Sequence, residues 1–235
     1  MTQEHYLAEV AHEVERIKEI YDASETIGYD ADGVLFDLES RVVWKVNSRH
    51  GTSYTVDMIT EWHTVRNWLV DLGNPLEEAE ASQFRDYWEN RELILSSPLI
   101  KGAWEMILAC ERDGKNAIVA TSRQFFLEET TRLQLQRRLG LIRPENIHIR
   151  KAGDEDRKGF KGRVVNVRGI GVFFENDPLH IEGILEQTNI PVVWVPFYPR
   201  YEKQYPEIAS NPRVIKLPYL YLLAQVLYPD TRIVL

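Results

Sequence analysis

Two carboxylates stand two residues apart after a short apolar segment near the amino terminus. Asp30 and Asp32 follow residues 26–29, and Gly33 comes directly after them. If 26–29 is a buried parallel strand, Asp30 stands at its carboxyl end, where open α/β sheets bind ligands, and the glycine allows a sharp turn. This spacing predicts that one carboxylate attacks a substrate while the other moves protons. An ordinary turn is the alternative, because Asp and Gly are common turn residues.

Two hydroxyl side chains hold a similar position after the next predicted strand. Thr121 and Ser122 follow the apolar segment 117–120 and precede a predicted helix. Backbone N–H groups and the helix dipole favour negative charge at such a position. The two hydroxyls are therefore candidate phosphate ligands, although Ser and Thr are also ordinary helix N-caps.

Two lysines lie ahead of a short helix predicted at 163–168. Lys158 and Lys161 stand among glycines, and the ammonium group of either is a candidate point charge on a phosphate. Spacing alone does not choose between them. Each also suits the usual role of a lysine, which is to be solvated at the surface.

Three oxygen-bearing side chains follow the apolar segment 172–174. Glu175, Asn176 and Asp177 precede a proline, and oxygen ligands of this kind are those that Mg²⁺ prefers. Asn176 and Asp177 suit a second role equally well, because such residues ahead of a proline commonly cap a helix.

The elements that carry these residues alternate along the chain. The predicted strands are 26–29, 117–120, 147–149, 172–174, 191–197 and 214–217. From residue 98 onward, the predicted helices are 98–110, 126–139, 163–168, 178–188 and 218–227. Alternating helices and strands predict an α/β fold with a doubly wound parallel sheet. The carboxyl ends of parallel strands share one edge of the sheet, so the candidate residues are expected to meet there.

The segment 38–97 interrupts this alternation. Apolar residues recur at helical spacing over 56–72 and 76–93, which predicts a small helical insert after the first core strand. The aromatic residues of this insert form either the apolar core of its helices or, in part, a platform on which a base stacks. The tryptophans concerned are Trp44, Trp62, Trp68 and Trp88.

The amino-terminal segment 1–25 is expected to be a helical extension of the core, which itself comprises 26–37 and 98–235. One face of the helix predicted at 3–22 carries an apolar stripe formed by Leu7, Val10, Val14, Ile17 and Tyr21. This stripe is expected to pack on its own domain. A homodimer through a seam of coiled-coil type is the alternative.

The motifs resemble, in chain order, those of the haloacid dehalogenase-like (HAD) phosphatases. The string Asp30-Ala31-Asp32-Gly33-Val34-Leu35 is similar to the first motif of that superfamily, Asp-x-Asp-Gly-Thr/Val-Leu. Thr121 resembles the second motif, Lys161 the third, and Glu175-Asn176 the fourth. Lys161 is preferred to Lys158 because the superfamily places a lysine, a short helix, a glycine and then a strand before the acidic pair.

The resemblance extends over about residues 27 to 217, and the insert stands where the superfamily carries a helical cap. The segments 100–103 and 119–123 look like the 5′(3′)-deoxyribonucleotidase branch. The chain departs from the pattern at Gly28, where a bulky aliphatic residue is usual, and in the Glu-Asn pair, where two acids are common.

This resemblance implies a Rossmann-like HAD core and a phosphatase mechanism. Asp30 would be the nucleophile that forms an aspartyl-phosphate, and Asp32 the general acid and base. Thr121, Ser122 and Lys161 would hold the phosphoryl oxygens.

The resemblance also implies Mg²⁺ as cofactor. Its implied ligands are Asp30, the backbone carbonyl of Asp32, Glu175 and Asn176, with Asp177 expected to cap the following helix. Asn176 lacks the charge of a second acid, so Glu175 is expected to supply the anionic help.

Composition limits the partners. The chain has 235 residues and a formal net charge of −8, which argues against general binding to nucleic acid or to anionic membranes. Its apolar stretches are shorter than the ~18 residues that span a bilayer, and its acidic start is unlike a signal peptide, so we expect a cytoplasmic protein. Cys110 is the single cysteine, which excludes a disulfide framework.

Other enzyme classes lack their motifs here. The chain has no P-loop string, no three-glycine dinucleotide loop and no His-Glu-x-x-His pattern, and Asp32 disfavours a dehalogenase. With the resemblance, this leads us to expect a magnesium-dependent hydrolase of small phosphomonoesters, a 5′-nucleotidase or a phosphatase of another small phosphorylated metabolite. The alternative is a non-catalytic or weakly catalytic binding protein that keeps the fold.

Overall fold

A computed structural model describes residues 3–59, 63–196, 198 and 200–229, with side chains from Val10 onward. Within these residues, six parallel strands form one sheet in the order β3-β2-β1-β4-β5-β6. The strands are β1 (Thr26–Tyr29), β2 (Asn116–Thr121), β3 (Ile147–Ile149), β4 (Val172–Glu175), β5 (Val192–Trp194) and β6 (Val214–Lys216). The predicted doubly wound α/β sheet is thus confirmed; Phe197, the end of one predicted strand, lies outside the described residues.

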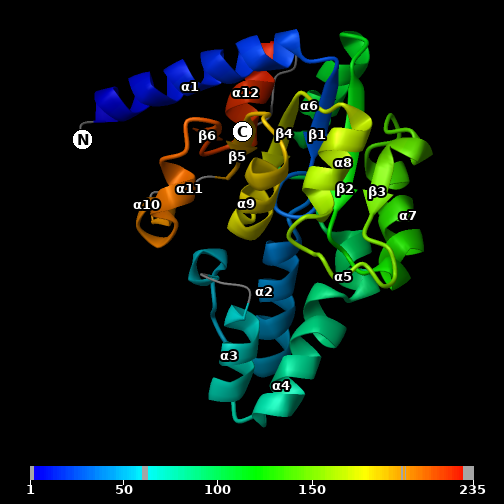
Figure 1. Cartoon of the computed structure of the whole chain (residues 1–235). Helices are drawn as coiled ribbons and strands as arrows, with labels where there is room; N and C mark the ends of the chain where they lie inside the picture. The colour runs from blue at the N-terminus through cyan, green and yellow to red at the C-terminus, as the bar shows by residue number, and fades with distance from the viewer. Residues whose placement is uncertain (1–2, 60–62, 197, 199, 230–235) are drawn as a thin grey trace.

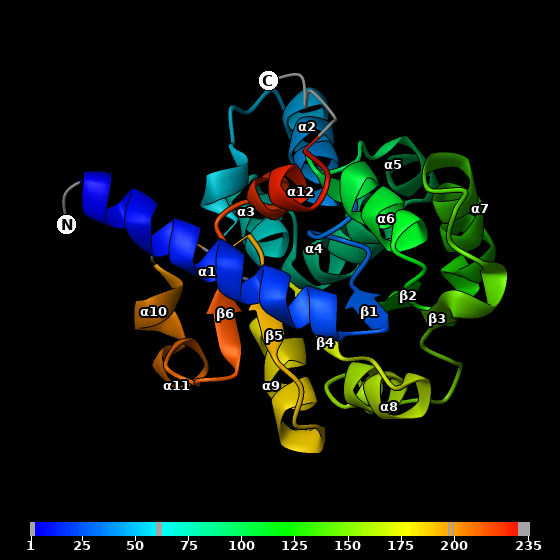
Figure 2. The ribbon, with the colours of Figure 1, turned by 90° about the horizontal axis from the view of Figure 1, so that it is seen from above.

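Helices cover both faces of the sheet (Figures 1 and 2). One face packs against α1 (Gln3–Ala23), α6 (Ala103–Arg112), α7 (Glu128–Arg138) and α12 (Leu220–Leu227), and the other against α8 (Phe160–Arg168), α9 (Pro178–Gln187), α10 (Tyr201–Gln204) and α11 (Pro206–Ala209). Strand β4 shows why both faces are apolar: Phe174 points into the first layer and Phe173 into the second. Side chains alternate along a strand, so a strand buried on both faces is apolar throughout.

Gly28 departs from the superfamily pattern for a packing reason. It pairs with Phe173 across the β1–β4 ladder, and a Cβ added at Gly28 would overlap the ring of Phe173 and crowd Ile170. The bulk that the first strand lacks is therefore supplied by its neighbour.

The amino-terminal helix packs on its own chain. Val14, Ile17 and Tyr21 are buried, and α1 lies across α12 and β6 (Figure 2). The side chain of Leu7, the first residue of the predicted stripe, lies outside the described part of the chain. The homodimer through this helix remains a prediction. None of the described helices combines the length and the apolar character needed to cross a membrane.

The helices between β1 and α6 form a layer beyond the carboxyl edge of the sheet (Figure 1). They are α2 (Leu38–His50), the 3₁₀ turn Val56–Met58, α3 (Thr64–Asp71), α4 (Leu76–Ser82), the π-helical turn Gln83–Trp88 and α5 (Arg91–Ser96). Their buried apolar side chains form a cluster separate from the two sheet layers. We call residues 38–97 the insert.

The structure differs from the sequence prediction at two places around the insert. Helix α2 was not predicted, although Asp37 caps it by accepting from the Ser40 N–H at 3.0 Å and its buried face has helical spacing. The helix predicted at 98–110 begins only at Ala103, because Leu99 forms a β-bridge with Phe36 and Gly102 has a left-handed φ of 93°. Pro98 accepts a hydrogen bond from the Asp37 N–H at 2.9 Å. That hydrogen bond joins the two ends of the insert.

Helical spacing over 56–72 likewise predicted one continuous helix, and this was wrong. Of its described residues, 56–58 form a 3₁₀ turn, Ile59 is extended, and α3 begins at Thr64. Residues 60–62, with Trp62, lie outside the described residues.

Candidate active site

Three neighbouring strands end at one edge of the sheet, and each carries a predicted site residue there. Asp30 directly follows β1, and its N–H donates to the carbonyl of Phe174 at 3.0 Å. Thr121 is the last residue of β2 and Glu175 the last of β4. Because β1 lies between β2 and β4, the fold brings these three side chains together as the spacing predicts.

Lys161 joins two of the three strand ends. Its Nζ lies 2.8 Å from Oδ1 of Asp30 and 2.6 Å from Oε2 of Glu175, and all three side chains are buried. Burial by itself lowers the pKa of Lys161, but the two carboxylates outweigh this effect and raise the pKa. Burial also raises the pKa of Asp30 and of Glu175, while Lys161 opposes the rise in each.

Lys158 lies elsewhere. Its Nζ pairs with Glu182 at 3.0 Å and with Glu186 at 2.8 Å, both on α9. The two lysines are three residues apart, but only Lys161 lies inside α8 on the side that faces the sheet. Of the two candidates, the structure brings Lys161 to the strand ends.

The carboxylate of Glu175 is fully engaged. Its Oε1 accepts from the backbone N–H groups of Asn176 at 3.1 Å and Asp177 at 3.0 Å, and Oε2 faces Lys161. Asp177 caps α9 by accepting from the Leu179 N–H at 2.9 Å. Glu175 therefore holds Lys161 and the turn after β4. Of the three residues 175–177, Asn176 and Asp177 line the cavity and Glu175 does not.

Ser122 has a partner that was not predicted. Its Oγ lies 2.8 Å from Nε2 of His180, which is buried on the first turn of α9. Burial lowers the pKa of His180 well below its usual range, and Lys161, Arg157 and Arg150 lower it further. The imidazole is therefore neutral and orients the hydroxyl of Ser122.

Asp32 is held by a second unpredicted residue. Arg123 donates from Nε to Oδ2 at 2.8 Å and from Nη2 to Oδ1 at 2.6 Å, a bidentate pair. Nη1 of Arg123 donates to Gln134 at 2.8 Å, and Gln134 donates to the carbonyl of Ile94 in the insert at 2.5 Å. A hydrogen-bonded chain thus links Asp32 to helix α5 near the end of the insert.

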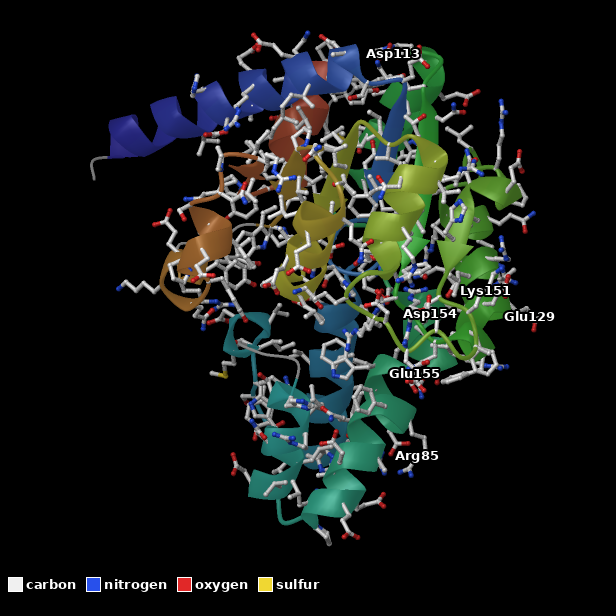
Figure 3. All side chains as sticks on the ribbon, viewed as in Figure 1. Arg85, Asp113, Glu129, Lys151, Asp154 and Glu155 are labelled. Atoms are coloured by element: carbon white, nitrogen blue, oxygen red, sulfur yellow. The ribbon has the colours of Figure 1, made fainter. Side chains whose placement is uncertain are left out.

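A cavity of about 510 Å³ lies between the insert and this edge of the sheet. The core contributes Asp30, Asp32, Thr121, Ser122, Arg123, Lys161 and Asn176 to its lining, and the insert contributes Leu38, Glu39, Val56, Ile59, Phe84, Trp88 and Glu89. Arg150 and Arg157, from the loop between β3 and α8, add positive charge. Lys151, Asp154 and Glu155 of the same loop lie at the edge of the core nearest the insert (Figure 3).

Comparison with known proteins identifies this architecture. No protein-family model and no curated protein matches the sequence. A HAD family hydrolase from Deinococcus radiodurans R1, determined with bound phosphate and sodium, has a TM-score of 0.57 at 16% identity, over 86% of this chain and 94% of that chain. A candidate phosphoglycolate phosphatase from Lactobacillus delbrueckii subsp. bulgaricus has a TM-score of 0.54 at 12% identity, over 86% and 98%. The fold is that of the HAD-like hydrolases.

A third solved structure agrees over a smaller part of the chain. A candidate phosphatase from Clostridium difficile has a TM-score of 0.50 at 14% identity, covering 72% of this chain and 84% of that chain. At these identities the likeness establishes the HAD-like fold, and the activity must be argued from the side chains.

The donor set at the strand ends fits a loosely held Mg²⁺. No group of three or more His, Cys, Asp or Glu side chains forms a metal cage among the described residues, but Mg²⁺ usually keeps several waters and needs few protein ligands. Oδ1 of Asp30 is buried and pairs with Lys161, and it accepts no other hydrogen bond within the described chain. The amide of Asn176 packs against Gly33, where it would overlap any Cβ, and the φ of 76° at Gly33 also favours glycine.

The tryptophans of the insert divide between its core and its surface. Trp68 is buried and stacks on Tyr54 with ring centroids 4.1 Å apart, and Trp88 is buried at the cavity wall. Trp44 is 55% exposed and is not among the residues that line the cavity. Only Trp88, of those described, is placed to contact a ligand.

The Arg123 pair leads to a kinetic prediction. If Asp32 transfers protons in hydrolysis of a phosphomonoester, Arg123→Gln should lower kcat by about 10- to 100-fold, because an acid or base that loses its orientation loses part of a contribution of roughly 10²–10⁴. The loss should be larger for an alkyl phosphate than for 4-nitrophenyl phosphate, whose leaving group needs little protonation. Arg132→Gln, which removes a surface pair with Glu128, is the control, and equal losses on both substrates would contradict the role.

Proposed function

We propose that this protein is a phosphatase of small phosphomonoesters. The observation that carries the proposal is the contact of Asp30 with Lys161 at the end of β1, beside Thr121 and Ser122 at the end of β2. A buried carboxylate, a cation and two hydroxyls at the mouth of one cavity are the groups that phosphoryl transfer requires.

In the proposed reaction a carboxylate oxygen of Asp30 attacks phosphorus. The bond from phosphorus to the leaving oxygen breaks, and Asp32 gives that oxygen a proton. Asp32 then accepts a proton from a water that attacks the aspartyl-phosphate, the bond to Asp30 breaks, and phosphate is released. Arg123 donates to both oxygens of Asp32, and each oxygen keeps a further lone pair with which to carry the proton.

The phosphoryl oxygens are proposed to lie against Lys161, Thr121 and Ser122. Charge spreads over these oxygens in the transition state, so fixed donors stabilise it more than the ground state. When Nε2 of His180 donates to Ser122, the hydroxyl hydrogen of Ser122 is left for a phosphoryl oxygen.

Mg²⁺ is proposed to bind through Asp30, the backbone carbonyl of Asp32 and the side-chain oxygen of Asn176. When bound, it would neutralise the developing negative charge and orient the phosphoryl group. Glu175 contributes to this site through Lys161, because its own oxygens are hydrogen-bonded.

Metal removal tests the proposed function. The protein should hydrolyse 4-nitrophenyl phosphate with Mg²⁺, and stripping the metal with EDTA should reduce the rate to background until Mg²⁺ is restored. Release of 4-nitrophenol measures the rate. Absence of turnover with Mg²⁺, Mn²⁺ or Co²⁺ would instead favour a binding protein that keeps the HAD-like fold.

The resemblance to the deoxyribonucleotidase branch makes nucleoside monophosphates the first natural substrates to test. A cytoplasmic location and a homodimer through α1 are further predictions. A substrate panel would rank nucleotides against sugar and polyol phosphates.

A further inference from the structure

The insert contributes a carboxylate to the cavity whose role the proposed reaction leaves open. Glu39 lies in the first turn of α2 and lines the cavity that Asp30 and Asp32 also line. Within the described chain, its side chain has no hydrogen bond and no ion pair. Asp37, two residues earlier, is occupied by capping α2 through Ser40. A carboxylate in a cavity wall gives up much of its hydration without compensation.

Arg200 is the cation best suited to pair with Glu39, but its guanidinium is held by other groups. Arg200 lines the same wall, but it donates to the backbone carbonyls of Asp57 at 2.9 Å and Ile59 at 3.2 Å. Its guanidinium also lies over the rings of Tyr198 and Tyr201, at 5.0 and 5.5 Å from their centroids. Arg200 therefore remains close enough to lower the pKa of Glu39 without forming an ion pair with it.

The cavity wall beside Glu39 therefore holds both a hydrogen-bond acceptor and a positive charge. Glu39 offers carboxylate oxygens, and Arg200 keeps a buried Nε–H that has no hydrogen-bond partner among the described residues. An anionic group would be repelled by Glu39 and an ammonium group by Arg200. A hydroxyl group is neutral and both donates and accepts, so it is the polar group that this wall suits.

We propose that Glu39 accepts a hydrogen bond from a hydroxyl group on the leaving alcohol, so that the substrates are hydroxylated phosphomonoesters such as polyol, sugar or ribose phosphates. This inference rests on the proposed phosphatase function. It assigns the insert a part in choosing the substrate, since Glu39 belongs to the insert and the groups that handle phosphate belong to the core.

Isosteric substrates test the proposal. In 2-hydroxyethyl, n-propyl and 2-aminoethyl phosphate, the terminal heavy atom is the oxygen of a hydroxyl, the carbon of a methyl or the nitrogen of an ammonium group. The series of 3-hydroxypropyl, n-butyl and 3-aminopropyl phosphate is one methylene longer. In one series or both, kcat/KM for the hydroxyl ester should exceed that of the other two by about 10- to 100-fold, the value of a hydrogen bond to a charged group. No preference in either series, or a preference for the ammonium ester, would overturn the proposal.

Variants locate the preference. Glu39→Leu should bring the ratio of hydroxyl to alkyl ester close to one, whereas Glu39→Gln, which keeps an acceptor oxygen, should retain part of it. Glu89→Leu is the matched control, because Glu89 is the insert's other glutamate in the cavity lining, and its ratio should stay near that of the unaltered protein. An equal change in both leucine variants would overturn the assignment to Glu39.

A stability measurement checks, without any substrate, that Glu39 lacks a partner. Burial, then Asp37, raises the pKa of Glu39 to about 7, with Arg200 opposing. A carboxyl whose pKa is raised on folding favours the folded state at low pH and loses that contribution as pH rises through the folded pKa. The groups around it are Asp32, Asp37, Arg200, Tyr198 and Tyr201.

Glu39→Gln should therefore gain melting temperature relative to the unaltered protein between pH 5 and pH 8. A variant that is less stable by the same amount at both pH values would show a structural partner and overturn the proposal. Turnover of 4-nitrophenyl phosphate by the unaltered protein separates the two levels: if it is absent, the phosphatase function fails, and if it is present without a hydroxyl preference, only this inference fails.

Discussion

Asp30→Asn should lower phosphomonoester turnover by on the order of 10⁴-fold or more, the scale on which enzymes lose rate when a covalent nucleophile is removed. The amide has no negative charge with which to attack phosphorus. The fold should persist, because Lys161 keeps its contact with Glu175. Initial rates with 4-nitrophenyl phosphate, together with a melting curve, measure both effects.

Asp113→Asn is a suitable control for this change. Asp113 follows α6 at the end of the sheet opposite the insert (Figure 3), where it pairs with Arg112. Turnover should be unaffected. If Asp30→Asn kept substantial activity at equal folding, the nucleophile would be another group.

Isotope labelling tests the route of the same reaction. In a single turnover in ¹⁸O-water, attack of water on phosphorus places the label in the released phosphate and leaves Asp30 unlabelled. Attack on the acyl carbon would place ¹⁸O in the Asp30 carboxylate. Mass spectrometry of the phosphate and of the peptide that contains Asp30 distinguishes the two routes, and an acid quench should trap the phosphoryl group on that peptide.

Lys161→Met should lower the free energy of unfolding by about 3–5 kcal/mol, the cost of removing one partner from a buried ion pair. The change leaves Asp30 and Glu175 buried without the cation that both contact. Urea denaturation monitored by tryptophan fluorescence measures the loss. Adding Glu175→Leu should recover part of it, because an apolar replacement removes one of the unpaired carboxylates.

Lys158→Met is the matched control for Lys161. Lys158 contacts two glutamates as well, but its side chain is 31% exposed and theirs are 49% and 56% exposed. Surface ion pairs contribute about 0–1 kcal/mol each, so a loss below ~1 kcal/mol is expected. Equal losses in the two variants would contradict the prediction that the buried ion pairs of Lys161 contribute more to the free energy of unfolding than the surface pairs of Lys158.

The arrangement of the strand ends was predictable because it follows from local pattern and one rule of topology. Apolar segments of strand length predicted β1, β2 and β4, and parallel strands bring their carboxyl ends to one edge. Asp30 and Thr121 therefore met as expected. The helix caps were equally local: the hydrogen bond from the Leu179 N–H to Asp177 spans two residues.

The insert was harder to predict because its helices are short and broken. Apolar spacing over 56–72 indicated a helix from Val56 onward. The residues on either side of the 3₁₀ turn Val56–Met58 are extended instead. Helix α2 offered a signal that was available, namely Leu38, Val42 and Val46 at helical spacing after a capping Asp37. Without α2, the position of Glu39 in the cavity had no basis in the sequence.

By itself, the sequence determined the sheet, its central strands and the set of polar residues at their carboxyl ends, because period and strand direction are local properties. Tertiary structure alone decided how those residues are partnered. Arg123 meets Asp32 across 91 positions and His180 meets Ser122 across 58, and no local spacing encodes such pairs. The resemblance preferred Lys161 to Lys158, and the folded chain brings Lys161 of α8 to Asp30 and Glu175 while Lys158, ahead of α8, pairs with α9. Each is a long-range packing outcome, so it appears only once the chain is folded.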